Sequence, residues 1–240
     1  MDLRDAFGPG QVVSVVGAGG KKSALYALAN SLDRAVVTAT VRIPLFDEEV
    51  AELRVTDNPQ KAIEEANAWP LGVVPARDGT RSRYVGYDRK TVDELAATTD
   101  VPILIKADGA RTRLLKAPND DEPQVPRSTD ILVPVASVRA VGKPLDPEYV
   151  HRPERVAALT GRSAGERIEP ADVVTVISND DGGLKGRPDG ARVVPLLNMV
   201  DDDGLRATAR SIATELLNSP RIERVVLGRM NRGKVVEIVS

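Results

Sequence analysis

Three glycines and two lysines stand together near the N-terminus, in an order that suits phosphate binding. Residues 17–23 read Gly-Ala-Gly-Gly-Lys-Lys-Ser, and they follow the apolar run Val12 to Val16. A glycine loop between a strand and a helix lets backbone N–H groups surround an oxyanion, and the first helical turn adds unpaired donors. We therefore predict a nucleotide site whose phosphate contacts come from Gly17, Ala18, Gly19, Gly20, Lys21, Lys22 and Ser23.

This segment departs from the full phosphate-loop pattern G-x-x-x-x-G-K-[ST]. Val15 stands where the first glycine is expected, Lys22 takes the place of the hydroxyl residue, and Ser23 follows one position later. What remains, G-x-x-G-K-x-S, is a short variant like that of the Mur ligases. The alternative is an ordinary glycine turn with solvated lysines. These departures weaken the prediction of Mg²⁺ coordination more than the prediction of phosphate binding.

A single carboxylate follows the apolar strand expected over 101–107. Asp108 stands where phosphate-loop proteins deliver an acid from a buried strand to Mg²⁺. We predict catalytic roles for Lys21 and Asp108, and a metal shell formed by Ser23, Thr40 and Asp108. Lys106 shares a strand face with Asp108, so it either pairs with a carboxylate or presents a second cation to the phosphates.

More cations follow on the long loop expected over 111–127. Arg111, Arg113 and Lys116 suit an anionic second substrate at the mouth of the site, and we include Arg111 and Lys116 among the nucleotide contacts. The alternative is a solvated loop whose charge is neutralised by the acidic residues 120–122. Arg42, after the strand expected over 35–40, is a further candidate phosphate contact.

Asn198 and Asp201 have the spacing of the Asn-Lys-x-Asp motif with which GTPases read guanine, with Met199 in the lysine position. Asn and Asp are also good helix caps, and a helix is expected from about residue 202. Capping is the simpler interpretation; if base recognition also holds, GTP binds more tightly than ATP. For His151, a role as a helix cap or packing group is preferred over a role as a general base.

The elements that must position these residues follow from hydrophobic periodicity. Apolar runs predict strands over 11–16, 35–40, 71–75, 83–86, 101–107, 131–135, 191–197, 222–227 and 234–239. Helical spacing predicts helices over 21–32, 60–66, 91–97, 153–159, 170–177 and 202–217. Residues 47–55 are expected to be a short helix or irregular. Thr91 and Glu94 have capping-box spacing.

This alternation predicts one α/β domain over residues 1–240. We expect a P-loop NTPase-like, mostly parallel sheet with helices on both faces and a small insertion, in which 71–75 and 83–86 form a hairpin through a turn at 78–79. Ligands of such sheets bind beyond the carboxyl ends of the strands. The residues that follow strands should therefore converge on one crevice.

The composition excludes several function classes. The formal net charge is −2 and aromatic residues are 3 %, so neither a basic field nor stacking platforms point to nucleic acid. Cysteine is absent and there is one histidine, which excludes disulfides, thiolate sites and multi-histidine metal sites. No apolar run approaches the ~18 residues of a membrane span, and no signal peptide is recognised. We expect a cytoplasmic protein that binds neither nucleic acid nor a membrane.

An ordered set of short motifs resembles the YqeC family over about residues 12–239. The motifs are Gly17-Ala18-Gly19-Gly20-Lys21, Ala107-Asp108-Gly109-Ala110-Arg111, Leu115-Lys116-Ala117-Pro118, Glu122-Pro123, Gly142-Lys143-Pro144-Leu145, His151-Arg152-Pro153-Glu154 and Leu197-Asn198-x-x-Asp201. The family is described as accessory proteins of selenium-dependent molybdenum hydroxylases, and it resembles phosphate-loop nucleotide-binding proteins.

The resemblance implies an ATP- or GTP-dependent, Mg²⁺-assisted step in the maturation of such a hydroxylase, with the hydroxylase or a small anion as partner. It implies an NTPase or a phosphoryl or nucleotidyl transferase; the alternative is a nucleotide-gated binding protein or insertion chaperone with negligible turnover. The resemblance assigns functional roles to residues 17–21, Asp108, Lys116, Glu122, His151 and Asn198. Lys22, Lys106 and Met199 depart from the family's usual threonine, glutamate and lysine.

Overall fold

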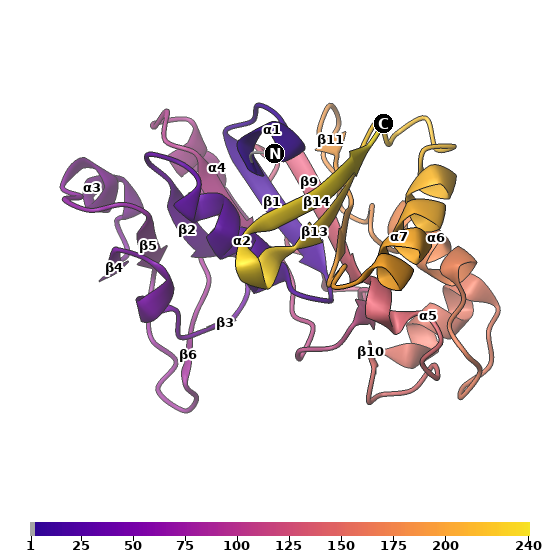
Figure 1. Ribbon diagram of the computed structural model, residues 1–240. Helices are drawn as coiled ribbons and strands as arrows, with labels where there is room; N and C mark the ends of the chain where they lie inside the picture. Colours follow the sequence, from indigo (N-terminus) through magenta and orange to yellow (C-terminus); the bar gives the residue numbers. More distant parts are fainter. Residues whose placement is uncertain (1–2) are drawn as a thin grey trace.

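The computed structural model describes residues 3–240. The strands of its central sheet are β1 (Val12–Gly17), β2 (Val36–Ala39), β4 (Glu52–Val55), β5 (Leu71–Val74), β7 (Ile103–Lys106), β9 (Ile131–Ser137), β11 (Arg192–Val193), β12 (Leu196–Asn198), β13 (Val225–Arg229) and β14 (Lys234–Val239). They run in the order β14-β13-β12-β9-β1-β7-β2-β5-β4, with β11 beside β9. In Figure 1, the labelled strands β4, β5, β2, β1 and β9 follow one another from left to right. Only the β13–β14 pairing within this described sheet is antiparallel.

The helices are α1 (Leu3–Phe7), α2 (Lys21–Asn30), α3 (Pro59–Glu64), α4 (Arg89–Ala96), α5 (Pro153–Thr160), α6 (Pro170–Ser178) and α7 (Asp203–Leu216), with the short 3₁₀ turns η1 (Asp47–Glu49), η2 (Val138–Ala140) and η3 (Met230–Arg232). Two small sheets pair β3 (Ile43–Pro44) with β6 (Arg83–Tyr84), and β8 (Leu115–Lys116) with β10 (Val150–His151). Figure 1 places α3 and α4 toward one end of the sheet and α5, α6 and α7 toward the other.

Alternation along the buried strands explains why helices cover both faces. In β1, Val13 and Val15 belong to the core that includes α1 and α2, whereas Val12 and Val16 belong to the core that includes α3 and α4. A third core joins the far half of the sheet to α5, α6 and α7. Strands buried on both faces read as continuous apolar runs, and the predicted α/β class with a mostly parallel, helix-flanked sheet is confirmed.

Several local predictions were wrong. The run 83–86 does not pair with 71–75, because β5 lies between β2 and β4 while β6 pairs with β3. The turn at 78–79 exists, but it joins residues 76–78 to 83–85, with the backbone N–H of Asp78 donating to the carbonyl of Arg83. Residues 52–55 form strand β4. The cap of α4 is Asp88, whose carboxylate accepts from the Thr91 N–H.

The register brings the carboxyl ends of three strands together. In β1 and β7, Val15 lies opposite Lys106, and in β2, Ala39 lies opposite the same residue. The glycine loop (residues 17–20), the segment after β2 and the segment after β7 therefore leave the sheet side by side. This is the convergence that the parallel arrangement predicts.

Candidate functional site

A cavity of about 710 Å³ opens at the carboxyl ends of β1, β2 and β7. Its walls include residues 19–23 from the glycine loop and α2, residues 109–113 after β7, His151 at the end of β10 and Met199 after β12. Nine cationic residues line it, namely Lys21, Lys22, Arg42, Arg81, Arg83, Lys106, Arg111, Arg113 and Arg152. Glu122 supplies the one carboxylate among the described lining residues. Such a wall attracts an anion of several charges.

The backbone donors of the glycine loop divide into two groups. The N–H groups of Gly17, Ala18 and Gly19 donate within the protein, to the Asp108 carboxylate and to the carbonyls of Val135 and Arg113, at 2.8–2.9 Å. The next four N–H groups, of residues 20–23, have no acceptor in the described structure. The unpaired donors are thus those of the first turn of α2, where the helix dipole also favours an anion.

Asn198 fastens the loop to the C-terminal part of the sheet. Its side-chain amide donates to the carbonyl of Gly19 at 2.8 Å, and its side-chain oxygen accepts from the N–H of Met230 at 3.0 Å. The contact is so close that a Cβ added to Gly20 would lie 2.2 Å from this amide nitrogen. Asn198 is 2 % exposed, and it positions the loop.

Asp108 is held between two lysines. Its Oδ1 lies 2.9 Å from the Lys21 Nζ, and its Oδ2 lies 2.8 Å from the Lys116 Nζ. Lys21 also donates to the carbonyl of Gly17. Burial opposes ionisation of Asp108, but the two positive charges prevail and hold the pKa of this carboxyl below its usual value. Burial lowers the pKa of Lys21 in turn, and the charge of Asp108 counteracts it.

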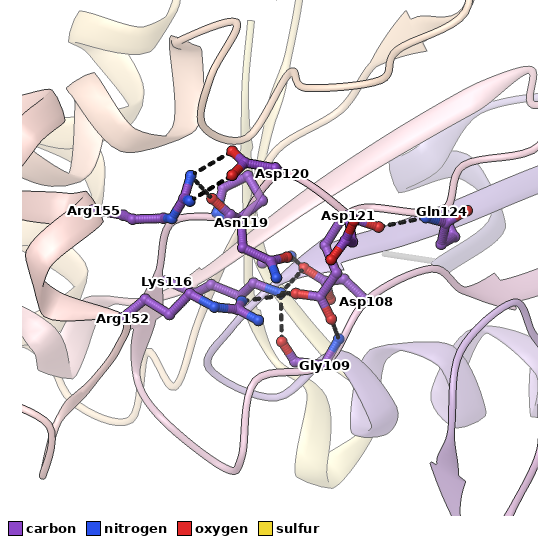
Figure 2. Close-up of polar contacts among 12 residues, drawn as sticks. Asp108, Gly109, Lys116, Asn119, Asp120, Asp121, Gln124, Arg152 and Arg155 are labelled. Atoms are coloured by element: carbon purple, nitrogen blue, oxygen red, sulfur yellow. Dashed lines mark hydrogen bonds and ion pairs between the residues drawn. The ribbon is translucent and has the colours of Figure 1, made fainter.

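The ion pairs continue from Lys116 to two residues that line the cavity, Glu122 and Arg152. Lys116 pairs with Glu122 at 2.7 Å, and Arg152 pairs with the same carboxylate oxygen at 2.8 Å. Figure 2 shows Lys116 and Arg152 pointing toward Asp108 and Gly109, with the Arg155–Asp120 pair to one side. Lys116 thereby links Asp108, next to the glycine loop, to the segment around Arg152.

Two further groups in the wall are shifted toward their neutral forms. Burial, assisted by the charge of Lys21, lowers the pKa of Lys106 to about 7, and its Nζ donates to the carbonyl of Arg42 at 2.8 Å. Burial and the charge of Arg152 lower the pKa of His151 to about 4. An anion in the cavity would favour protonation of both groups.

The three predicted metal ligands, Ser23, Thr40 and Asp108, do not converge on one point in the structure. Asp108 is 1 % exposed and does not line the cavity, and both its oxygens are ion-paired. The Thr40 hydroxyl donates to the carbonyl of Gln124 at 2.6 Å. Ser23 lines the cavity. A divalent cation needs converging oxygen ligands, so this donor set does not fit Mg²⁺.

Other predicted residues divide between the cavity wall and its support. Gly19, Gly20, Lys21, Lys22, Ser23 and Arg111 line the cavity, whereas Gly17, Ala18, Lys116, Asn198 and Asp201 are not among its lining residues. The Asp201 carboxylate pairs with Arg139 and with Arg229, the latter at 3.0 Å. The cap of α7 is Asp202, whose side chain accepts from Leu205.

Sequence reasoning did not single out Arg81, Arg83 or Arg152 as cavity residues. Arg81 and Arg83 reach the site because β6 pairs with β3, a contact that no local pattern announces. In the structure, Arg152 is distinguished by its backbone, whose φ of +63° lies in the left-handed region that non-glycine residues rarely adopt.

The backbone is strained around the same cavity. In the described chain, the non-glycine residues with positive φ are Arg111, Thr112, Arg152 and Met199, and all of them line the cavity. Side chains rarely adopt this conformation, and such strain gathers at functional sites. The clustering is independent of charge and marks the same place.

Comparisons with known proteins agree with the motif order. The model of the family described as "YqeC protein" matches residues 13–154, which is more than half of the chain. The "Uncharacterized protein YqeC" of Escherichia coli (strain K12) is 29 % identical over 230 residues, covering 90 % of this chain and 86 % of that protein. No solved structure matches. Within residues 3–240, no helix has the length and apolar character that crossing a bilayer requires.

Proposed function

This chain belongs to the YqeC family, and we propose that it binds a nucleoside triphosphate by its phosphates in the cavity at the carboxyl ends of β1, β2 and β7. The observation that carries the proposal is the meeting of four unpaired N–H groups of residues 20–23 with nine lining cations. Backbone donors at a helix N-terminus are a general phosphate-binding device, and the lining cations supply positive charge.

The phosphates lie against the first turn of α2 in this proposal. Lys21 and Lys22 contact them from the helix, and Lys106 contacts them from the end of β7. In this arrangement Lys21 leaves Asp108 for the phosphate, while Lys116 keeps that carboxylate neutralised at 2.8 Å. The protein contributes positioning and charge neutralisation, which are the main terms in phosphoryl transfer.

A second group of lining residues, outside the glycine loop and α2, suits a second anionic substrate. Arg111, Arg113 and Arg152 line the cavity there, together with His151, whose lowered pKa keeps the imidazole neutral at neutral pH. Two anions held in one cavity are brought into reach of each other, which is the effect that an enzyme needs for transfer between them. We propose phosphoryl or nucleotidyl transfer, or hydrolysis, at this junction.

The resemblance to accessory proteins of selenium-dependent molybdenum hydroxylases supplies a biological setting for this activity. That setting is a step in the maturation of a selenium- or molybdenum-dependent hydroxylase, with the hydroxylase or a small anion as the partner. The pairing of Asp201 with two arginines favours neither ATP nor GTP.

One observation favours binding without turnover as a second candidate. Glu122, the one carboxylate among the described lining residues, is engaged by Lys116, Arg152 and the Gly109 N–H. A carboxylate held this way is a poor general base. The alternative is therefore a nucleotide-gated binding protein or insertion chaperone.

Calorimetric titration with ATP and GTP tests the proposal. We expect saturable binding by the wild type and at least a tenfold rise in Kd, ~1.4 kcal/mol, for Lys22→Ala. Lys90→Ala is the matched control, since Lys90 is an exposed lysine on α4, and it should bind as the wild type does. Absence of heat with both nucleotides would refute the proposal.

Single-turnover hydrolysis separates the two candidate functions. Nucleotide consumption that rises with the client hydroxylase or a small anion supports the enzyme. Tight binding without consumption under either condition supports the gated binding protein.

A further inference from the structure

We propose that the triphosphate enters this site without a divalent cation, and that Lys21, Lys22 and Lys106 take the place of the metal. The inference rests on the proposed function and specifies the form of its ligand. The ligand is a free polyphosphate chain, carried by a nucleoside or by inorganic tripolyphosphate.

The first line of support is that the carboxylates of Asp108 and Glu122 are already engaged by cations of the protein. Asp108 lies behind Lys21, does not line the cavity, and has an ammonium group within 2.9 Å of each oxygen. Glu122 does line the cavity, but it already receives Lys116, Arg152 and the Gly109 N–H. A divalent cation would have to displace a lysine or an arginine to reach either carboxylate.

The second line of support is what occupies the positions near the phosphates. In the general phosphate-loop pattern, a hydroxyl residue follows the lysine and binds Mg²⁺. Here the residue after Lys21 is Lys22, and it lines the cavity. Lys106 adds an amine from the end of β7, and no carboxylate lies within ion-pair distance of it in the described structure.

Electrostatics then decides which form of the ligand is preferred. A free triphosphate carries more negative charge than its Mg²⁺ complex, so a wall of cations attracts the free form more strongly. A free Mg²⁺ ion is repelled by the same wall, because both carry positive charge. The neutralisation that a metal normally supplies comes here from side chains of the protein.

The experiment compares affinities with and without the metal. ATP and tripolyphosphate are titrated into the full chain in excess EDTA and in saturating MgCl₂, with NaCl added to match ionic strength because salt screens exposed charges. We expect the Kd for ATP in EDTA to be equal to or lower than the Kd in MgCl₂, with a difference of up to about tenfold. A Kd in EDTA more than about threefold higher than in MgCl₂ overturns the inference.

Lys22→Thr, which restores the hydroxyl residue, provides the variant test. Lys22 is partly exposed in the first turn of α2, so the fold should persist, as circular dichroism can verify. We expect this variant to lose affinity in EDTA by at least fivefold and to lose less in MgCl₂, while Lys90→Ala keeps the wild-type ratio. Equal losses in both buffers would contradict the assignment of Lys22 to the role of the metal.

Failure of the inference is separable from failure of the proposed function. Binding of ATP in MgCl₂ alone leaves the function standing and removes the metal-free form. No binding in either buffer removes the proposed function and the inference with it. The tripolyphosphate titration identifies the source of the ligand, because binding equal to that of ATP assigns the affinity to the phosphates, and weaker binding assigns a share to the nucleoside.

Discussion

Replacement of Asp108 by Asn tests the buried charge arrangement most directly. In the wild type, Lys21 and Lys116 both pair with this carboxylate, at 2.9 and 2.8 Å, and all three side chains are buried. After the replacement, Lys116 retains Glu122 at 2.7 Å, so Lys21 is the ammonium that loses its counter-charge. Breaking a buried pair from one side costs about 3–5 kcal/mol.

We therefore expect Asp108→Asn to lower the free energy of unfolding by about 3 kcal/mol or more. Urea denaturation followed by circular dichroism at neutral pH measures the change. Asp120→Asn is the matched control, because Asp120 lies on the same loop and pairs with Arg155 at the surface, and it should unfold as the wild type does. A loss below about 1 kcal/mol for Asp108→Asn would refute the reasoning.

The same variant distinguishes the roles that the sequence and the structure assign to Asp108. A metal ligand at this position predicts weaker ATP binding in MgCl₂. A counter-ion for Lys21 predicts that the freed ammonium turns to the phosphates, so the Kd in EDTA stays equal or falls. A rise in that Kd with unchanged stability would contradict the counter-ion role.

Three further predictions follow from individual contacts. Because the pKa of Asp108 is below its usual value of 3.8, its contribution to stability is complete above that pH and is lost as pH falls through the folded-state pKa; acid denaturation of Asp108→Asn should therefore be less steep than that of the wild type below about pH 4. Gly19→Ala places a Cβ 2.3 Å from the Ser137 nitrogen at φ +84°, so we expect a stability loss of ~2 kcal/mol or more and loss of ATP binding by calorimetry, while Gly79→Ala, which meets no atom within 4 Å, changes neither. Lys106→Met removes a buried amine without an ion-pair partner, and it should raise the thermal unfolding midpoint while increasing the Kd for ATP; a lowered midpoint would contradict this account.

Much of the central sheet was predictable because its signals are local. Strand β1 and helix α2 follow from an apolar β-branched run, a glycine turn and helical spacing within 20 residues, and Asn58 caps α3 as a residue before a first-turn proline should. The run 191–197 was predicted as one strand, but it divides into β11 and β12 around Val194 and Pro195. Proline cannot donate to a ladder, so this interruption had a readable cause.

Which strands pair with each other could not be predicted from local sequence patterns. Residues 83–86 have strand character, but nothing in them specifies β3 over β5 as the neighbour, and the turn at 78–79 favours the wrong alternative. The pairing of Ile43 with Tyr84 is decided by tertiary packing, in which Tyr84 also stacks edge-on against Phe46. This single error concealed two of the cavity arginines.

The candidate site was predicted in position but not in detail. The order of strand, glycine loop and helix located the cavity, since parallel strands bring their carboxyl ends together. The roles of Asp108 and Asn198 depend on which atoms they face, namely two lysines for one and Gly19 and Met230 for the other. Spacing alone cannot show whether a polar side chain faces a ligand or its neighbours.

The attachment of Gly19 through Asn198 to Met230 has a consequence for biosynthesis. Residues 17–20 are translated well before Met230, yet the amide that secures them accepts its own hydrogen bond from the backbone N–H of that residue. On the ribosome, an emerging chain can form β1 and α2 long before this link exists. Ligand competence should therefore arise only after Met230 has been translated, because until then the Asn198 side chain that holds the loop lacks its own anchoring hydrogen bond.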